Sequence, residues 1–190
     1  MPEPPRLRKP TAAELAAAAN LTIPDVAAPG LKVLFCGINP GLYSAATGCH
    51  FARPGNRFWP ALHRGGFTDR LLNPAEQELL LDQGLGITNV AARATARAEE
   101  LSAGELVEGG AILTAKLATL RPQWLAVLGV TAFRTAFSQK SATVGPQRPI
   151  GTTQVWVLPN PSGLNAHWPA AQLEAAFREL RQAAKLPSAD

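Results

Sequence analysis

The chain has 190 residues, enough for one compact domain with a hydrophobic core. Its formal net charge of +4 suits a polyanionic partner such as DNA, although a generic basic surface would give the same excess. No run of about 18 apolar residues occurs, so no membrane span is expected. The first nine residues lack the apolar segment and cleavage site of a signal peptide, and we therefore expect a cytoplasmic protein.

The N-terminal region predicts an arm followed by a short helix. Residues 1–10 are rich in proline and charge, which is typical of a mobile arm. Thr11 can cap a helix that reaches about Ala19, with Glu14 three residues later as the second half of a capping box. Residues 20–30 contain two prolines and a glycine and predict a connection. We therefore expect a flexible basic extension over residues 1–25 and a folded domain over residues 26–190.

The rest of the chain alternates short apolar runs with helical segments. The four expected strands are residues 32–37, 87–90, 124–129 and 154–159. The expected helices are residues 73–83 with Asn73 as cap and Pro74 at the first position, 102–120 with Ser102 and Glu105 as a capping box, 131–137, and 168–184. This order predicts an α/β domain with a mainly parallel sheet. Ligands of such domains bind beyond the carboxyl ends of the strands, so the segments after the first and fourth strands are of most interest.

The segment after the first strand reads Gly37-Ile38-Asn39-Pro40-Gly41. Two glycines and a proline favour a tight turn that brings backbone N–H groups close to a ligand. The Asn39 amide can both donate and accept hydrogen bonds. A plain strand-to-helix turn, with Asn39 present for its turn propensity, explains the same residues. The spacing excludes a phosphate-binding loop of either glycine-rich type.

Two further segments have both a DNA-binding and a structural interpretation. Residues 158–165 form a proline-stiffened loop in which Leu164 could insert into a base stack, or could instead be buried in the core. Residues 51–59 interleave Arg53 and Arg57 with aromatic side chains, a pattern that suits phosphate contact and base stacking. The structural alternative is a helix entry at Pro54 with Phe58 and Trp59 in the core, and for those two aromatics we favour it.

These motifs together resemble those of the mismatch-specific uracil-DNA glycosylases, a branch of the uracil-DNA glycosylase superfamily. Cys-Gly-Ile-Asn-Pro-Gly at residues 36–41 is similar to the first motif, and Leu-Pro-Asn-Pro-Ser-Gly-Leu at residues 158–164 is similar to the DNA-penetrating loop. Residues 53–59 and 65–69 are also similar, and the resemblance covers about residues 28–185. It implies a three-layer α/β/α domain around a parallel four-stranded sheet. It also implies hydrolysis of the N-glycosidic bond of a base that is flipped out of DNA. Unstacking and unpairing that base costs a few kcal/mol.

The resemblance also assigns roles to individual residues. Asn39 would position the attacking water, and Asn160 stands where the classical uracil-specific relatives carry a histidine. An amide is a poor base, so the base would depart as a stabilised anion before water adds. The remaining site residues are the base-pocket residues Gly37, Ile38, Pro40, Gly41, Ser44, Phe51 and Asn89, and the DNA-binding residues Ser162, Gly163, Leu164, Asn165, Arg53 and Arg57.

Two positions bear on the substrate. Gly41 stands where the classical relatives have a tyrosine that blocks a 5-methyl group. We therefore expect uracil opposite guanine in double-stranded DNA as the main substrate, with tolerance for ethenocytosine and weak removal of thymine. Ala92 stands where at least one relative has an aspartate, and Ala166 where some relatives carry an arginine. The loss of the aspartate makes Asn39 the sole organiser of water or marks a weakened enzyme.

Three functional classes compete on this sequence. The first is a monomeric, monofunctional glycosylase without metal or organic cofactor, since the motifs offer no amine nucleophile for a lyase and no metal-ligand spacing. The second is a low-turnover protein of the same fold that binds damaged or mismatched DNA, which the missing acid and base favour. The third, a serine or cysteine hydrolase, is disfavoured because Ser162 lacks a G-x-S-x-G turn and Cys36 lies within a strand.

Overall fold

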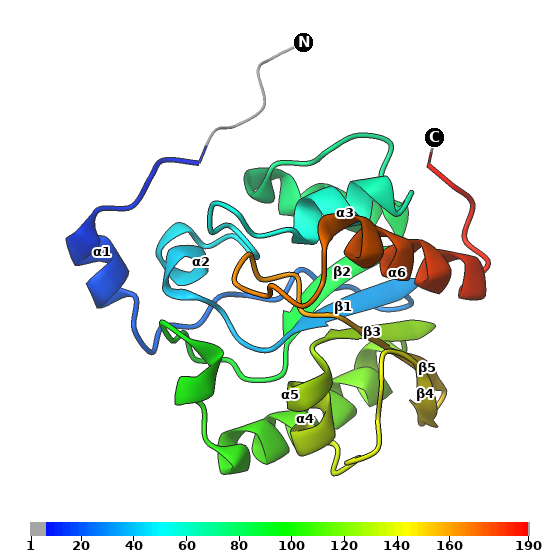
Figure 1. The fold of residues 1–190 in the computed structure, drawn as a ribbon. Helices are drawn as coiled ribbons and strands as arrows, with labels where there is room; N and C mark the ends of the chain where they lie inside the picture. Colours follow the sequence, from blue (N-terminus) through cyan, green and yellow to red (C-terminus); the bar gives the residue numbers. More distant parts are fainter. Residues whose placement is uncertain (1–6, 190) are drawn as a thin grey trace.

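The computed structural model describes residues 7–189, which form a central sheet covered by helices on both faces (Figure 1). The strands are β1 (Val33–Gly37), β2 (Leu85–Asn89), β3 (Trp124–Leu128), β4 (Gly145–Ile150) and β5 (Thr153–Leu158). Their order is β2-β1-β3-β5-β4, with β4 antiparallel to β5 and all other neighbours parallel. The predicted α/β domain with a mainly parallel sheet is confirmed, but the expected four strands are five.

The additional strand is β4, at the edge of the sheet. Its six residues include Pro146 and Pro149, which lack the backbone N–H of a regular strand. Proline is tolerated in a sheet at an edge, where one row of N–H groups has no neighbouring strand. The sequence pattern of a buried strand is therefore absent from residues 145–150, and the prediction missed them.

The helices follow the predicted order, with unpredicted ones at residues 42–47 and 98–100, and the helix entry considered at Pro54 is a helix that begins at Phe58. They are α1 (Ala12–Ala17), α2 (Leu42–Thr47), α3 (Phe58–Arg64), the 3₁₀ helices η1 (Pro74–Gln83) and η2 (Ala98–Glu100), α4 (Ala103–Leu120), α5 (Val130–Ala136) and α6 (Ala170–Ala183). The predicted capping boxes at Thr11 and Ser102 are formed, and the predicted cap Asn73 forms a capping box with Glu76 as well. The helix predicted at residues 73–83 is a 3₁₀ helix, and α2 was not predicted.

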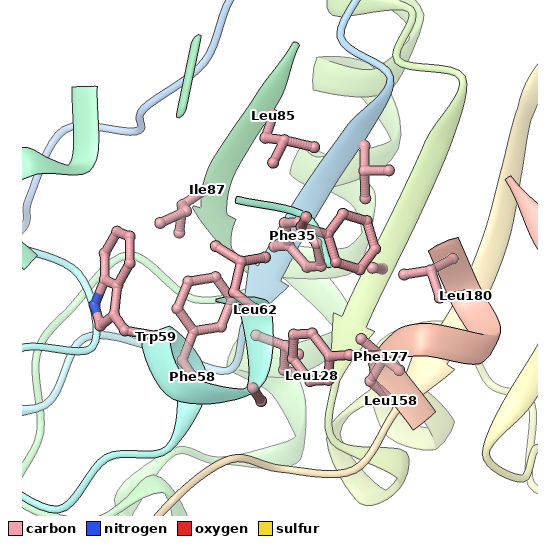
Figure 2. Close-up of a cluster of buried hydrophobic side chains, with 14 of the residues drawn as sticks. Phe35, Phe58, Trp59, Leu62, Leu85, Ile87, Leu128, Leu158, Phe177 and Leu180 are labelled. Carbon is pink, nitrogen blue, oxygen red and sulfur yellow. The ribbon is translucent and has the colours of Figure 1, made fainter. Parts of the chain in front are cut away.

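Alternate residues of the strands face two separate cores. Phe35 packs against Phe58 of α3 and Phe177 of α6 on one face (Figure 2). Leu34 and Cys36 point to the other face, where α4 and α5 cover them. Phe58 and Trp59 are 0 % and 4 % exposed, which confirms the core interpretation of those aromatics. The predicted three-layer arrangement is therefore present, with α3 and α6 on one side of the sheet and α4 and α5 on the other (Figure 1).

Part of the predicted N-terminal extension lies against the edge of the sheet next to β2. Asn20 donates a backbone hydrogen bond to Ala94 at 2.9 Å, and Ala94 donates one to Leu21 at 2.8 Å. Val26 pairs antiparallel with Ile87. These contacts attach residues 20–26 to the domain, while residues 1–6 of the extension lie outside the described residues. None of the described helices is long and apolar enough to cross a membrane.

Candidate functional site

The carboxyl ends of β1 and β2 continue as two loops that run side by side. Val90 donates a backbone hydrogen bond to Gly37 at 2.9 Å, Ala91 donates one to Ile38 at 2.9 Å, and Thr95 donates one to Pro40 at 3.2 Å. The first of these loops leads directly into α2, so the strand-to-helix turn considered for residues 37–41 is present. The pairing fixes the segment that carries Asn39 against residues 90–95.

The Asn39 amide is oriented by two acceptors. Its Nδ2 donates to the backbone oxygen of Arg93 at 2.9 Å and to Oγ1 of Thr95 at 2.7 Å. The Thr95 hydroxyl donates its own proton to the Arg97 carbonyl at 2.7 Å, so it can only accept from Asn39. The Asn39 Oδ1 atom accepts no hydrogen bond from any of residues 7–189 and is available to hold a water. Thr95 was not predicted, although it lies on the loop after the second strand.

Three of the predicted base-pocket residues are in mutual contact. A Cβ atom added to Gly37 would lie 2.5 Å from Oδ1 of Asn89 and 3.2 Å from the ring of Phe51. Phe51 has a positive φ of 53° and stacks on Phe58 with 4.1 Å between ring centroids. Glycine at position 37 is therefore required by the two side chains that occupy the space where its own would be.

His50, which was not predicted, orients Asn89. Its Nε2 lies 2.9 Å from the carbonyl oxygen of Pro24, which can only accept, so Nε2 carries the proton. The unprotonated Nδ1 then accepts from Nδ2 of Asn89 at 3.4 Å, which leaves the Asn89 oxygen on the side of Gly37. His50 is 2 % exposed, and burial lowers its pKa below the usual value, which keeps the ring neutral.

The other predicted base-pocket residues lie around the start of α2. Pro40 and Ser44 are buried, and Oγ of Ser44 accepts from the backbone N–H of Ala52 at 3.2 Å. The side chain of Ile38 lies against Gly129. Gly41 is exposed with ordinary φ, and a Cβ there would meet nothing within 4 Å. The backbone at position 41 therefore does not require glycine, and the missing side chain leaves open space at the start of α2.

The loop after β5 is held by its own polar groups and presents an apolar tip. Oδ1 of Asn160 accepts from the backbone N–H of Ser162 at 2.9 Å, and Asn165 donates its amide to the Asn160 carbonyl at 2.9 Å. The backbone N–H of Leu164 bonds to Oγ of Ser162 at 3.3 Å. Leu164 is 74 % exposed, so the alternative that buries it in the core is wrong. A Cβ at Gly163 would lie 2.5 Å from the Gly55 carbonyl, which places this loop against residue 55.

The two arginines predicted to bind DNA have different surroundings. Arg53 is exposed, and its guanidinium has no hydrogen-bond or ion-pair partner within the described chain. Arg57 is half-buried and donates to three backbone oxygens of the loop after β5, those of Trp168, Ser162 and Asn165. Among the described residues Arg53 is therefore unpaired, whereas Arg57 is engaged with the protein itself.

Ala92 lines a cavity of about 260 Å³ between the loop after β2 and α4. Asn89, Asp25 and Lys116 also line it. Lys116 pairs with Asp25, and both contact the hydroxyl of Thr88. An acidic residue at position 92 would therefore line this charged cavity. Among residues 7–189, no three or more His, Cys, Asp or Glu side chains form a group that could hold a metal ion.

The arrangement does not support the serine or cysteine hydrolase interpretation. Cys36 is fully buried in β1, and burial raises the pKa of its thiol. The hydroxyl of Ser162 accepts from a backbone N–H within its own loop. No histidine among residues 7–189 bonds to either side chain. Neither residue has the activating base that a nucleophile of this type needs.

Two comparisons with known proteins identify the family and support the fold. A family model described as the uracil DNA glycosylase superfamily matches residues 24–184. The chain is also similar to a solution NMR structure of a candidate uracil DNA glycosylase from Methanosarcina acetivorans, with a TM-score of 0.55 and 18 % identity over 85 % of this chain and 98 % of that one. At this identity the structural likeness supports the fold. The family match spans both loops of the site, and the chain belongs to the uracil DNA glycosylase superfamily.

Proposed function

We propose that this chain is a monofunctional glycosylase that removes uracil opposite guanine from double-stranded DNA by water attack on the flipped nucleotide. Membership of the superfamily supports a DNA glycosylase; the preference for the mismatch is the further step that we propose. The observation that carries the proposal is the Asn39 amide, held by two acceptors, with no donor to its oxygen within residues 7–189.

The chemistry follows from what an amide can and cannot do. The Asn39 oxygen can accept a hydrogen bond from a water and so hold it, but it cannot take the proton of that water. The nucleophile is therefore weak, and the glycosidic bond must be largely broken before water adds. The negative charge then develops on the departing base, where hydrogen-bond donors stabilise it most effectively. Rates should rise as the departing base becomes a more stable anion.

Three features support the choice of substrate. Leu164 is exposed at the tip of a braced loop, where it can fill the gap left by a flipped nucleotide. A mispaired uracil costs less to extract than a paired one. The open space at Gly41 offers no barrier to a base with a larger substituent, so ethenocytosine and, weakly, thymine belong to the proposed range.

The structure also bears on the proposed absence of strand cleavage. A lyase needs a free amine to form a Schiff base with the sugar. Lys116, which lines the cavity beside Asn89, is paired with Asp25 and bonded to Thr88. Its amine is engaged with partners, and an abasic site is therefore the proposed product.

Single-turnover release of uracil from a duplex with one G·U pair tests the proposal, beside the same duplex with an A·U pair. Asn39→Ala should lower release by orders of magnitude, since the water loses the side chain that we propose holds it. Asn73→Ala, which removes a side-chain amide from the start of η1 outside the predicted site, is the matched control and should retain activity. Equal release from G·U and A·U duplexes would contradict the mismatch preference.

A second function is favoured by one specific observation, that the two predicted catalytic residues, Asn39 and Asn160, are both amides and neither contacts a carboxylate. A protein whose site has two amides and no general base could bind mismatched DNA and release bases only slowly. The same assay separates the two functions. Tight binding of the G·U duplex by the unaltered protein without release of free uracil would establish the binding function and overturn the glycosylase.

A further inference from the structure

The loop that carries Leu164 is tied to the domain by one side chain from a distant part of the sequence. Arg57, at the start of α3, donates its backbone N–H to the carbonyl of Pro161 at 3.0 Å. One terminal nitrogen of its guanidinium donates to Trp168 at 2.5 Å, and the other donates to Ser162 and Asn165, both at 2.9 Å. A single residue therefore contacts carbonyl oxygens on both sides of Leu164.

The chemistry of these contacts needs an arginine. All four acceptors are backbone carbonyls, which remain acceptors at any pH. The planar guanidinium presents its donors in a fixed fork and can serve three oxygens in different directions at once. A lysine ammonium in the same place would keep the positive charge but would lack the planar set of donors that reaches three oxygens.

Among the described residues, the remaining hydrogen bonds of the loop are local. Asn160, Ser162 and Asn165 bond within the loop itself, and they shape the turn without fixing it to the domain. Gly163 approaches the carbonyl of Gly55, close in sequence to Arg57. Leu164, at the tip, is left 74 % exposed.

We propose that Arg57 is a positioning residue that holds the loop of residues 159–168 ready for insertion of Leu164 into DNA. This inference rests on the proposed function, since it assumes that Leu164 enters the duplex. Loops that are ordered only on binding lose conformational freedom at that step, and a loop already held in shape avoids this loss. Arg57 therefore acts on extraction of the base and not on cleavage of the bond, and it does so without touching a phosphate.

The test compares two DNA substrates with the same uracil. In one duplex the uracil pairs with guanine, and in the other it lies at the centre of a three-nucleotide mismatched bubble, where the base is already unpaired and its extraction costs less. Arg57→Lys should lower single-turnover release from the G·U duplex about tenfold and change release from the bubble less than twofold. Leu164→Ala should show the same pattern, and the double variant should be no slower than Leu164→Ala alone.

A role in phosphate binding gives the opposite pattern. Lysine keeps the positive charge, so Arg57→Lys would stay close to the unaltered protein, while Arg57→Gln would weaken binding and reduce its dependence on salt. That result would overturn the proposal. Arg53→Gln is the matched control for an exposed charge, and its effect should appear in the salt dependence of binding.

Release from the bubble also reports folding. If Arg57→Lys and Arg57→Gln both lose release from the bubble as well as from the duplex, Arg57 is required for the fold and the positioning role is overturned. If the unaltered protein releases no uracil from either substrate, the proposed function fails separately. The hydrogen-exchange rates of backbone amides in residues 160–168 then still test the role of Arg57. Faster exchange in Arg57→Lys supports the positioning role, and unchanged exchange overturns it.

Discussion

Replacement of Thr95 by valine should slow base release by disturbing the orientation of Asn39. The Thr95 hydroxyl accepts from the Asn39 amide and donates to the Arg97 carbonyl, both at 2.7 Å, and the residue is 3 % exposed. Valine has nearly the same shape but makes neither bond. A neutral hydrogen bond contributes about 0.5–1.5 kcal/mol net. At about 1.4 kcal/mol per tenfold in rate, the loss of one of the two Asn39 anchors predicts release that is roughly 2- to 12-fold slower.

The assay is single-turnover release of uracil from a G·U duplex at saturating protein, which isolates the steps after binding. Thr95→Ser keeps the hydroxyl and is the matched control, so it should stay close to the unaltered protein. The valine variant also leaves the Arg97 carbonyl and the Asn39 amide without this partner. Each unsatisfied buried group costs about 1–3 kcal/mol, and a domain of this size loses about 2–4 °C in Tm per kcal/mol.

The outcome that refutes the reasoning is specific. If Thr95→Val shows the expected fall in Tm but releases uracil at the unaltered rate, the hydroxyl supports the fold without setting the catalytic geometry. The Arg93 carbonyl would then be sufficient to orient the Asn39 amide. A serine variant as slow as the valine variant would likewise show that the methyl group, and not the hydroxyl, is what matters.

Three further predictions concern the predicted base pocket. Gly37→Ala should reduce uracil release while DNA binding is retained, because the new Cβ would lie 2.5 Å from Oδ1 of Asn89 and displace it; release at the unaltered rate would contradict this. Gly41→Tyr should abolish thymine removal and keep uracil removal, as measured on G·T and G·U duplexes, and equal losses on both would count against steric selection. Because the pKa of His50 is lowered in the folded state, the unfolded chain takes up the proton first as pH falls. Stability from this group is therefore present above about pH 6.5 and lost below it, and His50→Gln should flatten that slope in urea unfolding between pH 7.5 and 5.

The fold could be predicted where local sequence carries the signal. The strands buried on both faces appear as unbroken apolar runs, and the capping boxes at Thr11, Asn73 and Ser102 mark helix starts. The short helices α2 and α3 have six and seven residues, and their N-cap residues, Gly41 and Arg57, make no side-chain capping bond, so neither periodicity nor capping indicates where they begin. Strand β4 was missed because its prolines oppose the strand pattern.

The candidate site was predictable where it coincides with a motif, and not where it depends on contacts between segments. Asn39 and Asn160 follow the apolar runs that predict β1 and β5. Thr95, 56 residues from Asn39, and His50, 39 residues from Asn89, act only through pairing of distant loops. The same holds for Arg57, whose sequence context suggested phosphate contact although its partners lie more than 100 residues away.

The two edges of the sheet have a consequence for the behaviour of the protein at high concentration. An exposed edge strand is a template on which a second chain can add a strand of its own. At one edge, Val26 already exchanges backbone hydrogen bonds with Ile87 of β2, at 2.9 and 2.7 Å. At the other, Pro146 and Pro149 remove two backbone donors from β4. Growth of the sheet from one molecule to the next is thus opposed at both ends, and we expect the protein to stay free of edge-to-edge association at high concentration.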